Sequence, residues 1–400
     1  MESRRWPRAF QSQTSIVTAF TFLILCLTVG ATPTWTAPAG LERHYSKWKP
    51  TTVNCSAGQS INQALKHAKP RERILVQGMC HERVVITRPV TLDGGGSAFI
   101  DGGGVAPGQA VSAEFDGLVV IRGVTNVSLV GLTVQNATTN GILVAHGAAV
   151  VLRDINTRNN AFTGIVVMDN STAEAIDTIT QSNRLGFDVV TSSSLVLKGT
   201  FTTANNGTNG GDINGQSIVE LRGAQVTASD NQQFGIIAGS RSHLAVLGFE
   251  AAKGSTLTAF GNTVAGLGFG DSSLIVFSNT VITANNNGIG LLLTGSRVDI
   301  PPFAGATVVL HHNGLGMNLR LGAFANITAG LDVHDNGAGI RADQASLNLE
   351  ALPVLPASVS GNGTNVQLSF GSRSTIQNVT IGTPLICDST VLSRGTTLCP

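Results

Sequence analysis

Two short segments with histidines at matching positions carry the densest group of titratable side chains in the repetitive part of the chain. The first contains His311 and His312, and the second, 23 residues on, contains His334 and Asp335, each before an Asn-Gly pair. Imidazole titrates near neutral pH, so it can accept or donate a proton, and a carboxylate beside it favours its charged form. The sequence therefore offers a candidate acid–base site.

Charged side chains follow both histidine segments at equivalent distances. If the two segments lie side by side, Arg320 falls beside Asp343 and Asn318 beside Arg341. Guanidinium groups can stabilise the negative charge that develops when a proton is removed next to a carboxylate. The same residues also fit a surface ion pair, which contributes little to stability.

A second pair, His146 and Asp169, repeats the 23-residue spacing. A carboxylate next to an imidazole favours the protonated ring. An isolated pair of this kind is more often structural than catalytic.

A repeat must position all of these residues. In Ala284-Asn-Asn-Asn-Gly-Ile-Gly-Leu-Leu-Leu293, asparagine and glycine precede an alternating apolar run, and this pattern recurs every 22 to 31 residues. Its anchors are Gly141, Gly164, Gly186, Gly211, Gly235, Gly266, Gly290, Gly316 and Gly339, with Asn365 in the last place. A period of this length indicates a solenoid. The asparagines suit left-handed turns, and their stacked amides can hydrogen-bond from one turn to the next.

Positions one and three residues after each anchor form the expected inner face, since side chains of a strand alternate between its two faces. The first set is Ile142, Ile165, Phe187, Ile236, Leu291, Met317 and Ile340. The second is Val144, Val167, Val189, Ala238, Leu293, Leu319 and Ala342. Three short strands per period cannot bury an apolar face alone, so stacked turns must share one core.

We predict an all-β right-handed parallel β-helix of about ten to twelve turns with an N-terminal capping helix near residues 60–69. Ser60 and Gln63 form a capping box before a short apolar stripe at helical spacing, and Pro70 ends it. Leucine-rich repeats share the period but need fixed leucines and a helical segment per repeat. A left-handed β-helix needs a hexapeptide period, which this sequence lacks.

The capping helix, Ile74-Leu-Val-Gln-Gly78, Val84-Val-Ile86, Val90-Thr-Leu-Asp-Gly-Gly-Gly96 and the Asn-Gly repeats together resemble right-handed parallel β-helix proteins of the pectate-lyase type. The resemblance covers residues 53–380 and implies an extracellular polysaccharide as ligand. In the sugar-cleaving relatives a base abstracts a proton next to a carboxylate that cations or a metal neutralise. This implies a lyase or epimerase using His311, His334, Arg320 and Arg341. Asp335 and Asp343 are further candidate catalytic residues.

Catalytic signatures of the individual families are absent from the sequence. The Asp-Asp and Gly-His-Gly set of polygalacturonase-like hydrolases and the Asp-Pro-His-Asp of alginate epimerases are not found. No cofactor is predicted; calcium fits the resemblance, but no acidic ligand cluster is identified. Whether the protein is an enzyme stays open at this point.

The first 37 residues have the features of a signal peptide. Arg4, Arg5 and Arg8 precede an apolar stretch over residues 16–29, with small residues after it. Its removal leaves 22 basic side chains (25 − 3) and 23 acidic ones (24 − 1), so no nucleic-acid partner is expected. We predict a secreted protein, extracellular or periplasmic, with no stable membrane span after cleavage, and an irregular lead-in over residues 38–52.

Four cysteines remain after cleavage, which indicates two disulfides in a secreted protein. Cys55 and Cys80 are one repeat period apart, so they fall on neighbouring turns within bonding distance. Cys387 and Cys399 are expected to close a C-terminal cap over residues 381–400.

Outward positions on several turns are apolar rather than polar. They are Leu143, Ala145, Val166, Met168, Val190, Ile237 and Leu292, here called the apolar strip. Exposed, it would be unusual for a soluble monomer, so a loop, the lead-in segment or another molecule is expected to cover it.

The first hypothesis for the function is a secreted β-helix that binds a polysaccharide and, if catalytic, modifies it. The alternative is a non-catalytic surface or adhesion scaffold whose apolar strip meets a protein partner.

Overall fold

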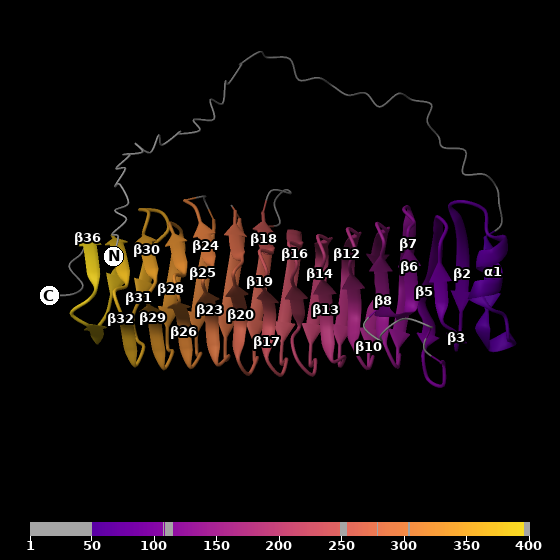
Figure 1. The fold of residues 1–400 in the computed structure, drawn as a ribbon, viewed down its shortest axis with the longest axis horizontal. Coiled ribbons are helices and arrows are strands. Elements are labelled where there is room, and N and C mark those ends of the chain that lie inside the picture. The colour runs from indigo at the N-terminus through magenta and orange to yellow at the C-terminus, as the bar shows by residue number, and fades with distance from the viewer. Residues whose placement is uncertain are drawn as a thin grey trace, which may run out of the picture. The chain divides into compact units, whose positions relative to one another are not determined.

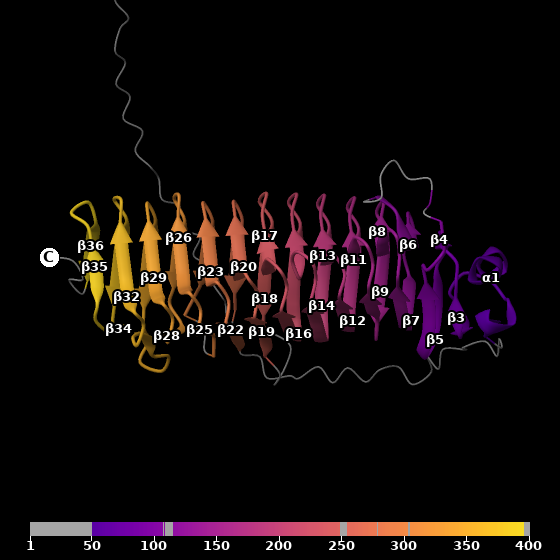
Figure 2. The same ribbon diagram turned by 90° about the horizontal axis from the view of Figure 1, so that it is seen from below.

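The computed structural model describes residues 50–106, 108, 115–248, 254–277, 279–302 and 305–395. In this part of the chain, strands stack turn upon turn along one axis, and neighbouring turns pair in parallel (Figures 1 and 2). This is the parallel β-helix that the repeat predicts. The predicted signal peptide and nearly all of the lead-in lie outside the described residues.

Within the described residues, the smaller sheet contains 13 strands, one for each turn. They are β4 (Val84–Ile86), β6 (Gly117–Arg122), β8 (Asn140–Ala145), β11 (Thr163–Val167), β13 (Leu185–Val189), β15 (Gly211–Ile213), β17 (Phe234–Ala238), β20 (Ala265–Gly270), β23 (Ile289–Thr294), β26 (Leu315–Arg320), β29 (Ala338–Asp343), β32 (Thr364–Ser369) and β35 (Leu385–Cys387). The number slightly exceeds the predicted ten to twelve because β4, β6 and β35 belong to turns without an anchor glycine.

The larger sheet contains 23 strands in the part of the chain that the structure describes. They are β1 (Thr51–Asn54), β2 (Glu72–Gln77), β3 (Met79–Cys80), β5 (Val90–Asp101), β7 (Val127–Gln135), β9 (Ala149–Arg153), β10 (Asn156–Arg158), β12 (Thr172–Gln181), β14 (Ser194–Ala204), β16 (Ile218–Ser229), β18 (His243–Leu247), β19 (Ser255–Phe260), β21 (Ser273–Val276), β22 (Thr280–Asn285), β24 (Arg297–Ile300), β25 (Thr307–His311), β27 (Phe324–Ile327), β28 (Gly330–His334), β30 (Ser346–Glu350), β31 (Ala357–Val359), β33 (Arg373–Gln377), β34 (Thr380–Ile381) and β36 (Leu392–Gly395). It consists of two ladders, which long strands such as β14 and β16 join by running through both. Each such turn therefore has three strand segments, as predicted.

The core fills the space inside the turns. All of the predicted inner side chains, at one and three residues after the anchors, are buried. The largest of them, Phe187, packs edge-to-face against Phe201 with ring centroids 5.6 Å apart. Apolar burial shared between neighbouring turns therefore holds the solenoid together.

One predicted anchor, Gly211, is wrong by one residue. Gly211 pairs with Phe187 across β13 and β15, so Gly210 is the true equivalent of Gly186. A Cβ atom on Gly211 would overlap the Phe187 ring, which explains a second glycine at this turn. A slip of one residue exchanges the two faces of a strand, so Asp212 faces outward rather than inward.

A ladder of buried asparagines lines the turn that leads into the smaller sheet. Each backbone N–H donates to the side-chain oxygen of the next asparagine at 2.9–3.1 Å. The members are Asn160, Asn183, Asn206, Asn231, Asn262, Asn287, Asn313, Asn336 and Asn362. The predicted hydrogen bonding between turns is confirmed, and it fixes where each strand of the smaller sheet begins.

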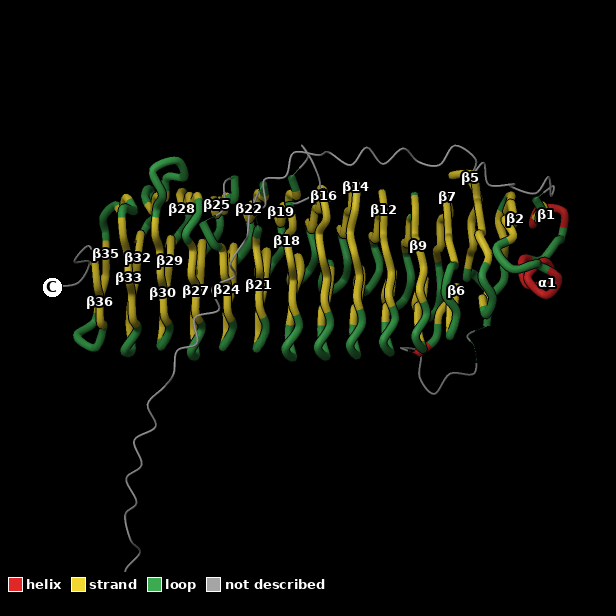
Figure 3. Tube along the Cα trace, turned by 90° about the horizontal axis from the view of Figure 1, so that it is seen from above, coloured by secondary structure: helices red, strands yellow, loops and turns green. Residues whose placement is uncertain are grey.

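A short helix covers the N-terminal end of the stack (red in Figure 3). It is α1 (Ile61–His67), preceded by the 3₁₀ turn η1 (Cys55–Ala57). The Ser60 hydroxyl accepts the Gln63 backbone N–H at 3.2 Å, and Ile61 and Leu65 are buried. The predicted cap is therefore present, slightly shorter than expected.

Cysteine pairing is confirmed at the N-terminal end. Cys55 and Cys80 form a disulfide between neighbouring turns, with Cα atoms 5.0 Å apart. Cys387 ends β35, whereas Cys399 lies outside the described residues, so their pairing stays a prediction. Strands β34, β35 and β36 continue both sheets into the segment expected to form the C-terminal cap.

Candidate functional site

The predicted histidine cluster forms at the turn between the two sheets. His311 and His334 pair in register, and their rings stack at 5.2 Å between centroids with 7° between planes. His311 Nδ1 lies 2.6 Å from His312 Nδ1, and His334 Nδ1 lies 2.9 Å from Asp335 Oδ2. The sequence spacing thus brought the imidazoles and a carboxylate together.

Burial and the neighbouring imidazoles set the protonation of this cluster. The pKa of His311 is lowered first by burial and then by the positive charges that His312 and His334 carry when protonated. The pKa of Asp335 is lowered, chiefly by its hydrogen bond with His334. His311 is therefore predominantly neutral at pH 7 and has the protonation state of a base.

The predicted arginine positions lie on the outer face of the smaller sheet. The register pairs Arg320 with Asp343 and Asn318 with Arg341, as predicted. The contacts differ, however: Arg320 Nε donates to Thr294 Oγ1 at 2.9 Å, whereas Arg341 Nε donates to Asp343 Oδ2 at 2.8 Å. The expected ion pair across the turns is replaced by one within a single strand.

Histidines and arginines do not converge on one point. His311 precedes β26 and Arg320 ends it, and a strand of that length spans roughly 16 Å. Among the described residues, no hydrogen bond or ion pair links the histidine cluster to Arg320, Arg341 or Asp343. A catalytic role for these residues stays a prediction.

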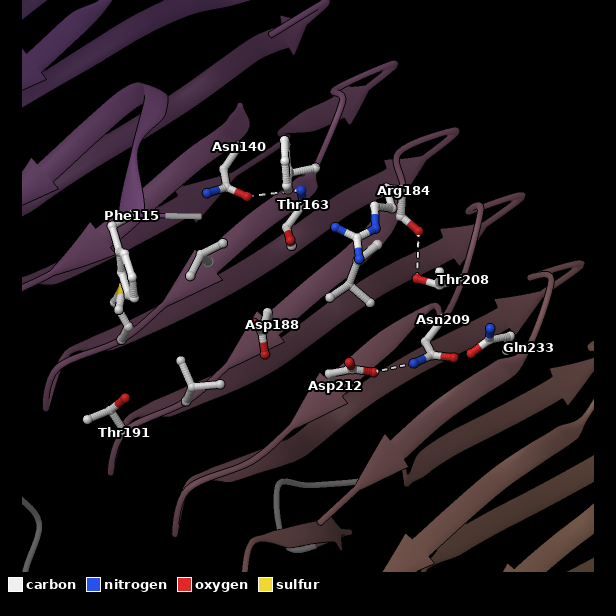
Figure 4. A pocket seen from close by; sticks show the side chains of 15 residues that line it. Phe115, Asn140, Thr163, Arg184, Asp188, Thr191, Thr208, Asn209, Asp212 and Gln233 are labelled. Carbon is white, nitrogen blue, oxygen red and sulfur yellow. Dashed lines mark hydrogen bonds between the residues drawn. The ribbon is translucent and has the colours of Figure 1, made fainter. Parts of the chain in front are cut away.

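A cavity of about 660 Å³ lies elsewhere, on the outer face of the smaller sheet over β11, β13 and β15 (Figure 4). This volume lies within the usual range for small-molecule sites, about 300–1,000 Å³. Phe115 and Gln233 are at opposite ends of the labelled lining residues, and Asp188 and Asp212 lie between them. The cavity therefore contains two carboxyl groups.

Asp188 and Asp212 are neighbours because β13 and β15 pair in register at these two residues. Adjacent strands lie about 4.8 Å apart, so side chains that leave the same face at paired positions are close together. Both aspartates are half-buried on the outer face. The aspartate pair is the one place on this face where acids occupy paired positions of neighbouring strands, among the described pairings.

Asp212 is held by an oriented amide. Asn209 Oδ1 accepts the Phe234 backbone N–H at 3.1 Å, which leaves Asn209 Nδ2 to donate to Asp212 Oδ1 at 2.7 Å. Burial raises the pKa of the Asp212 carboxyl to about 6, although the hydrogen bond from Asn209 acts in the opposite direction. Asp212 is thus an acid that keeps its proton under mildly acidic conditions.

Aromatic rings and a single guanidinium border the acids. The Arg184 guanidinium lies 5.5 Å from the centroid of the Phe162 ring, a cation–π contact. Thr208 Oγ1 donates to the Arg184 backbone carbonyl at 2.8 Å. Phe115 is 52% exposed at the rim, an unusual position for a large apolar ring. Exposed aromatic faces are suited to pack against the C–H faces of a ligand.

Sequence analysis missed this cavity because of the error at Gly211. With the correct anchor, Asp188 and Asp212 both stand two residues after their anchor glycines, Gly186 and Gly210. Gly186 and Gly210 are 24 residues apart, and so are Asp188 and Asp212. This equal spacing is the signal that would have placed the two acids at paired positions of neighbouring strands.

The apolar strip adjoins this cavity and is largely buried within the chain. Leu143, Ala145, Val166 and Met168 are 2–7% exposed and form a small cluster of their own with Val120. Phe115 lines a small cavity together with three of these residues, so it contributes to their cover. The strip is therefore not an open apolar surface at these turns.

The second predicted pair is confirmed beside the strip. His146 Nδ1 lies 3.0 Å from Asp169 Oδ2 across two turns. Both side chains occupy left-handed turn positions, with φ of 60° and 56°. The pair therefore links the turns of two adjacent coils through their side chains.

The described ranges contain neither a metal-binding cluster nor a membrane-spanning helix. No group of three or more histidine, cysteine, aspartate or glutamate side chains there is arranged to hold a metal ion, so calcium has no identified ligand set in this part of the chain. No helix there is long and apolar enough to cross a membrane.

Comparisons with known proteins return fold neighbours only. No protein-family model matches the chain, and no curated protein matches it. The A-module of a mannuronan C-5 epimerase from Azotobacter vinelandii is 15% identical, with a TM-score of 0.41 over 86% of this chain and 99% of that one. An alginate lyase from Paenibacillus sp. is 14% identical, with a TM-score of 0.37 over 84% of this chain and 99% of that one.

A pectate lyase is similar at 12% identity and a TM-score of 0.35, over 88% of this chain and 80% of that one. By their names, these neighbours are an epimerase and two lyases that act on polysaccharides. At such identities and TM-scores the likeness carries no argument about this chain's activity. The class of protein, a parallel β-helix, rests on its own strand pairing.

Proposed function

We propose that this protein binds a polysaccharide in the cavity over β11, β13 and β15 and hydrolyses it with Asp188 and Asp212. The observation that carries the proposal is the pair of carboxyl groups on neighbouring strands inside an open cavity. A carboxyl group that keeps its proton can act as a general acid, and the pKa of Asp212 is raised to about 6.

The roles of the two aspartates follow from the proton that Asp212 carries. Asp212 carries the proton and donates it to the oxygen of the leaving sugar as the glycosidic C–O bond breaks. The Asp188 carboxylate attacks the anomeric carbon and forms a glycosyl ester. The Asp212 carboxylate then takes a proton from water, whose oxygen displaces Asp188 and restores both groups. The strand spacing of about 4.8 Å is close to the roughly 5 Å between carboxyls in retaining glycosidases, which supports this two-step route over inversion.

Asn209 acts as a positioning residue in this scheme. Its amide is fixed by the Phe234 N–H, so its Nδ2 always faces Asp212. This hydrogen bond aims the carboxyl into the cavity.

The lyase or epimerase chemistry is kept as a second proposal, at His311, His334, Arg320 and Arg341, with Asp335 and Asp343. The lowered pKa of His311 favours it, because a neutral imidazole can abstract a proton. The two proposals differ in products, since a lyase leaves an unsaturated sugar and a hydrolase does not.

Secretion belongs to the same proposal. A disulfide between Cys55 and Cys80 indicates an oxidising compartment. Export through the predicted signal peptide accounts for it and places the protein where polysaccharides occur.

The test is a survey of purified protein on neutral and uronate polysaccharides, following reducing ends and unsaturated products separately. Asp188→Asn and Asp212→Asn should each lower hydrolysis by at least about 100-fold, the usual contribution of an acid–base group. Asp154→Asn on an exposed turn is the matched control, and His311→Ala tests the second site. Hydrolysis that survives in both cavity variants contradicts the proposal; binding without turnover supports the scaffold alternative.

A further inference from the structure

We infer that the cavity accepts an uncharged glycan and excludes uronates. This inference rests on the proposed function for the location of the site, and it goes further by naming the class of substrate. It departs from the uronate polymers that the sequence resemblance implies.

Charge is the first reason. Among the described residues that line the cavity, Arg184 is the only basic one, whereas two, Asp188 and Asp212, are acidic. The Arg184 guanidinium is already engaged over the Phe162 ring. A uronate brings one negative charge per sugar into a half-buried space beside carboxylates, where the repulsion is stronger than in water. The described lining residues offer one positive charge, that of Arg184, so they offset at most one such charge.

The remaining lining suits uncharged sugars. Hydroxyl and amide groups of Thr163, Thr191 and Gln233 lie around the acids and can exchange hydrogen bonds with sugar hydroxyls (Figure 4). Apolar side chains, among them Phe115 and Met168, also line the cavity. A neutral pyranose offers both kinds of surface, hydroxyls at its edge and C–H groups on its faces. The cavity matches both without requiring a counter-charge.

Position along the solenoid supports the same conclusion. Arg320 and Arg341, which could neutralise uronates, lie on β26 and β29, whereas the cavity lies over β11, β13 and β15. Three strands of the smaller sheet, β17, β20 and β23, separate the two groups. Arg320 and Arg341 thus occupy a different stretch of this face from the aspartate pair.

Binding is measured by calorimetry, with oligosaccharides of equal length from neutral glucans, mannans and xylans and from polygalacturonate and alginate. At least one neutral series should bind at least about tenfold more tightly than either uronate series, a difference of roughly 1.4 kcal/mol. Its affinity should change little with ionic strength, because no charge pairing is involved. Phe115→Ala should weaken this binding about tenfold, within the usual range for a central aromatic contact. The matched control is Phe370→Ala, at another exposed phenylalanine just after β32.

An Asp188→Asn/Asp212→Asn double variant tests whether the charge of the two carboxylates, rather than the shape of the cavity, excludes uronates. It should keep neutral binding and gain uronate binding, since the repelling carboxylates are gone. Tighter binding of uronates than of neutral sugars to the unmodified protein, or no neutral binding at all, overturns the inference. Because turnover is not needed for these measurements, loss of hydrolysis in the proposed mechanism would leave the binding result interpretable.

Discussion

Asp212 combines a half-buried carboxyl with a single oriented amide donor. Burial disfavours the charged form, and one hydrogen bond from Asn209 is not enough to compensate, so the pKa of Asp212 rises to about 6, above the usual range for an aspartate. A folded-state pKa above the unfolded value favours folding at low pH, and this contribution is lost as the pH rises through about 6. The residue thus costs stability at neutral pH, as groups in functional sites often do.

Replacing Asp212 by asparagine should therefore stabilise the protein at about pH 8 by roughly 1–3 kcal/mol. The difference should vanish at about pH 4, where Asp212 is protonated in the wild-type protein. Denaturant unfolding at the two pH values measures it, with Asp154→Asn as the control for loss of an exposed carboxylate. A variant that is less stable than wild type at both pH values contradicts the assigned environment of Asp212.

The asparagine ladder is the element that sets the register of the smaller sheet. Asn287 donates its side-chain amide to Asn313 Oδ1 at 3.1 Å and to the Ala259 carbonyl at 3.0 Å, while its oxygen accepts from Asn262. The buried Asn287 side chain therefore forms hydrogen bonds with both neighbouring turns. These hydrogen bonds fix the position of each turn relative to the next. The side-by-side placement of β13 and β15 under the cavity depends on them.

Asn287→Asp should destabilise the protein by about 2–5 kcal/mol, because a buried carboxylate oxygen then faces acceptors in place of a donor. Its neighbour Asn286 is exposed, with φ of 52°, and Asn286→Asp should change stability by less than about 0.5 kcal/mol. Thermal unfolding of the pair measures the difference. Equal unfolding temperatures for the two variants would show that the ladder contributes nothing.

Sequence patterns predicted the repeat, the three strands per turn and the inner face, because alternation and Asn-Gly spacing are local signals. They also placed His311 next to His334 and His146 next to Asp169, since these pairs sit in turns of regular length. They failed at Gly210-Gly211, where two glycines leave the register open and only the fit of Phe187 settles it. The candidate acids were missed for that reason, and the raised pKa of Asp212 depends on burial that no sequence pattern reports.

At the scale of the whole molecule, each turn contacts mainly its two neighbours, so the ends determine where unfolding starts. The N-terminal end is held by α1 and by the Cys55–Cys80 disulfide, which joins η1 to β3. Opening that end exposes the first strands of both sheets, and unpaired edges promote association.

Cys55→Ser/Cys80→Ser should lower stability at this end by about 2–4 kcal/mol, the usual effect for a disulfide that closes a loop of this length. Hydrogen exchange should accelerate in α1 and β2 and remain unchanged in β23 and β26. Variants are preferable to reducing agent, because Cys387 and Cys399 form a second predicted pair. Uniform acceleration along the chain would contradict the neighbour-by-neighbour account.

The central claim is that Asp188 and Asp212 are the two working groups of one hydrolytic site, and leaving-group dependence tests it most directly. On a glycoside whose aryl leaving group needs no protonation, Asp212→Asn should still release a burst of the aryl group as the glycosyl ester forms, with slow turnover afterwards because the base of the second step is gone, whereas Asp188→Asn should release none. The wild-type rate on polysaccharide should fall as the pH rises through about 6, and that decline should be absent for the aryl glycoside. Equal losses for the two variants on both substrates, or a pH profile unaffected by the leaving group, would contradict the claim.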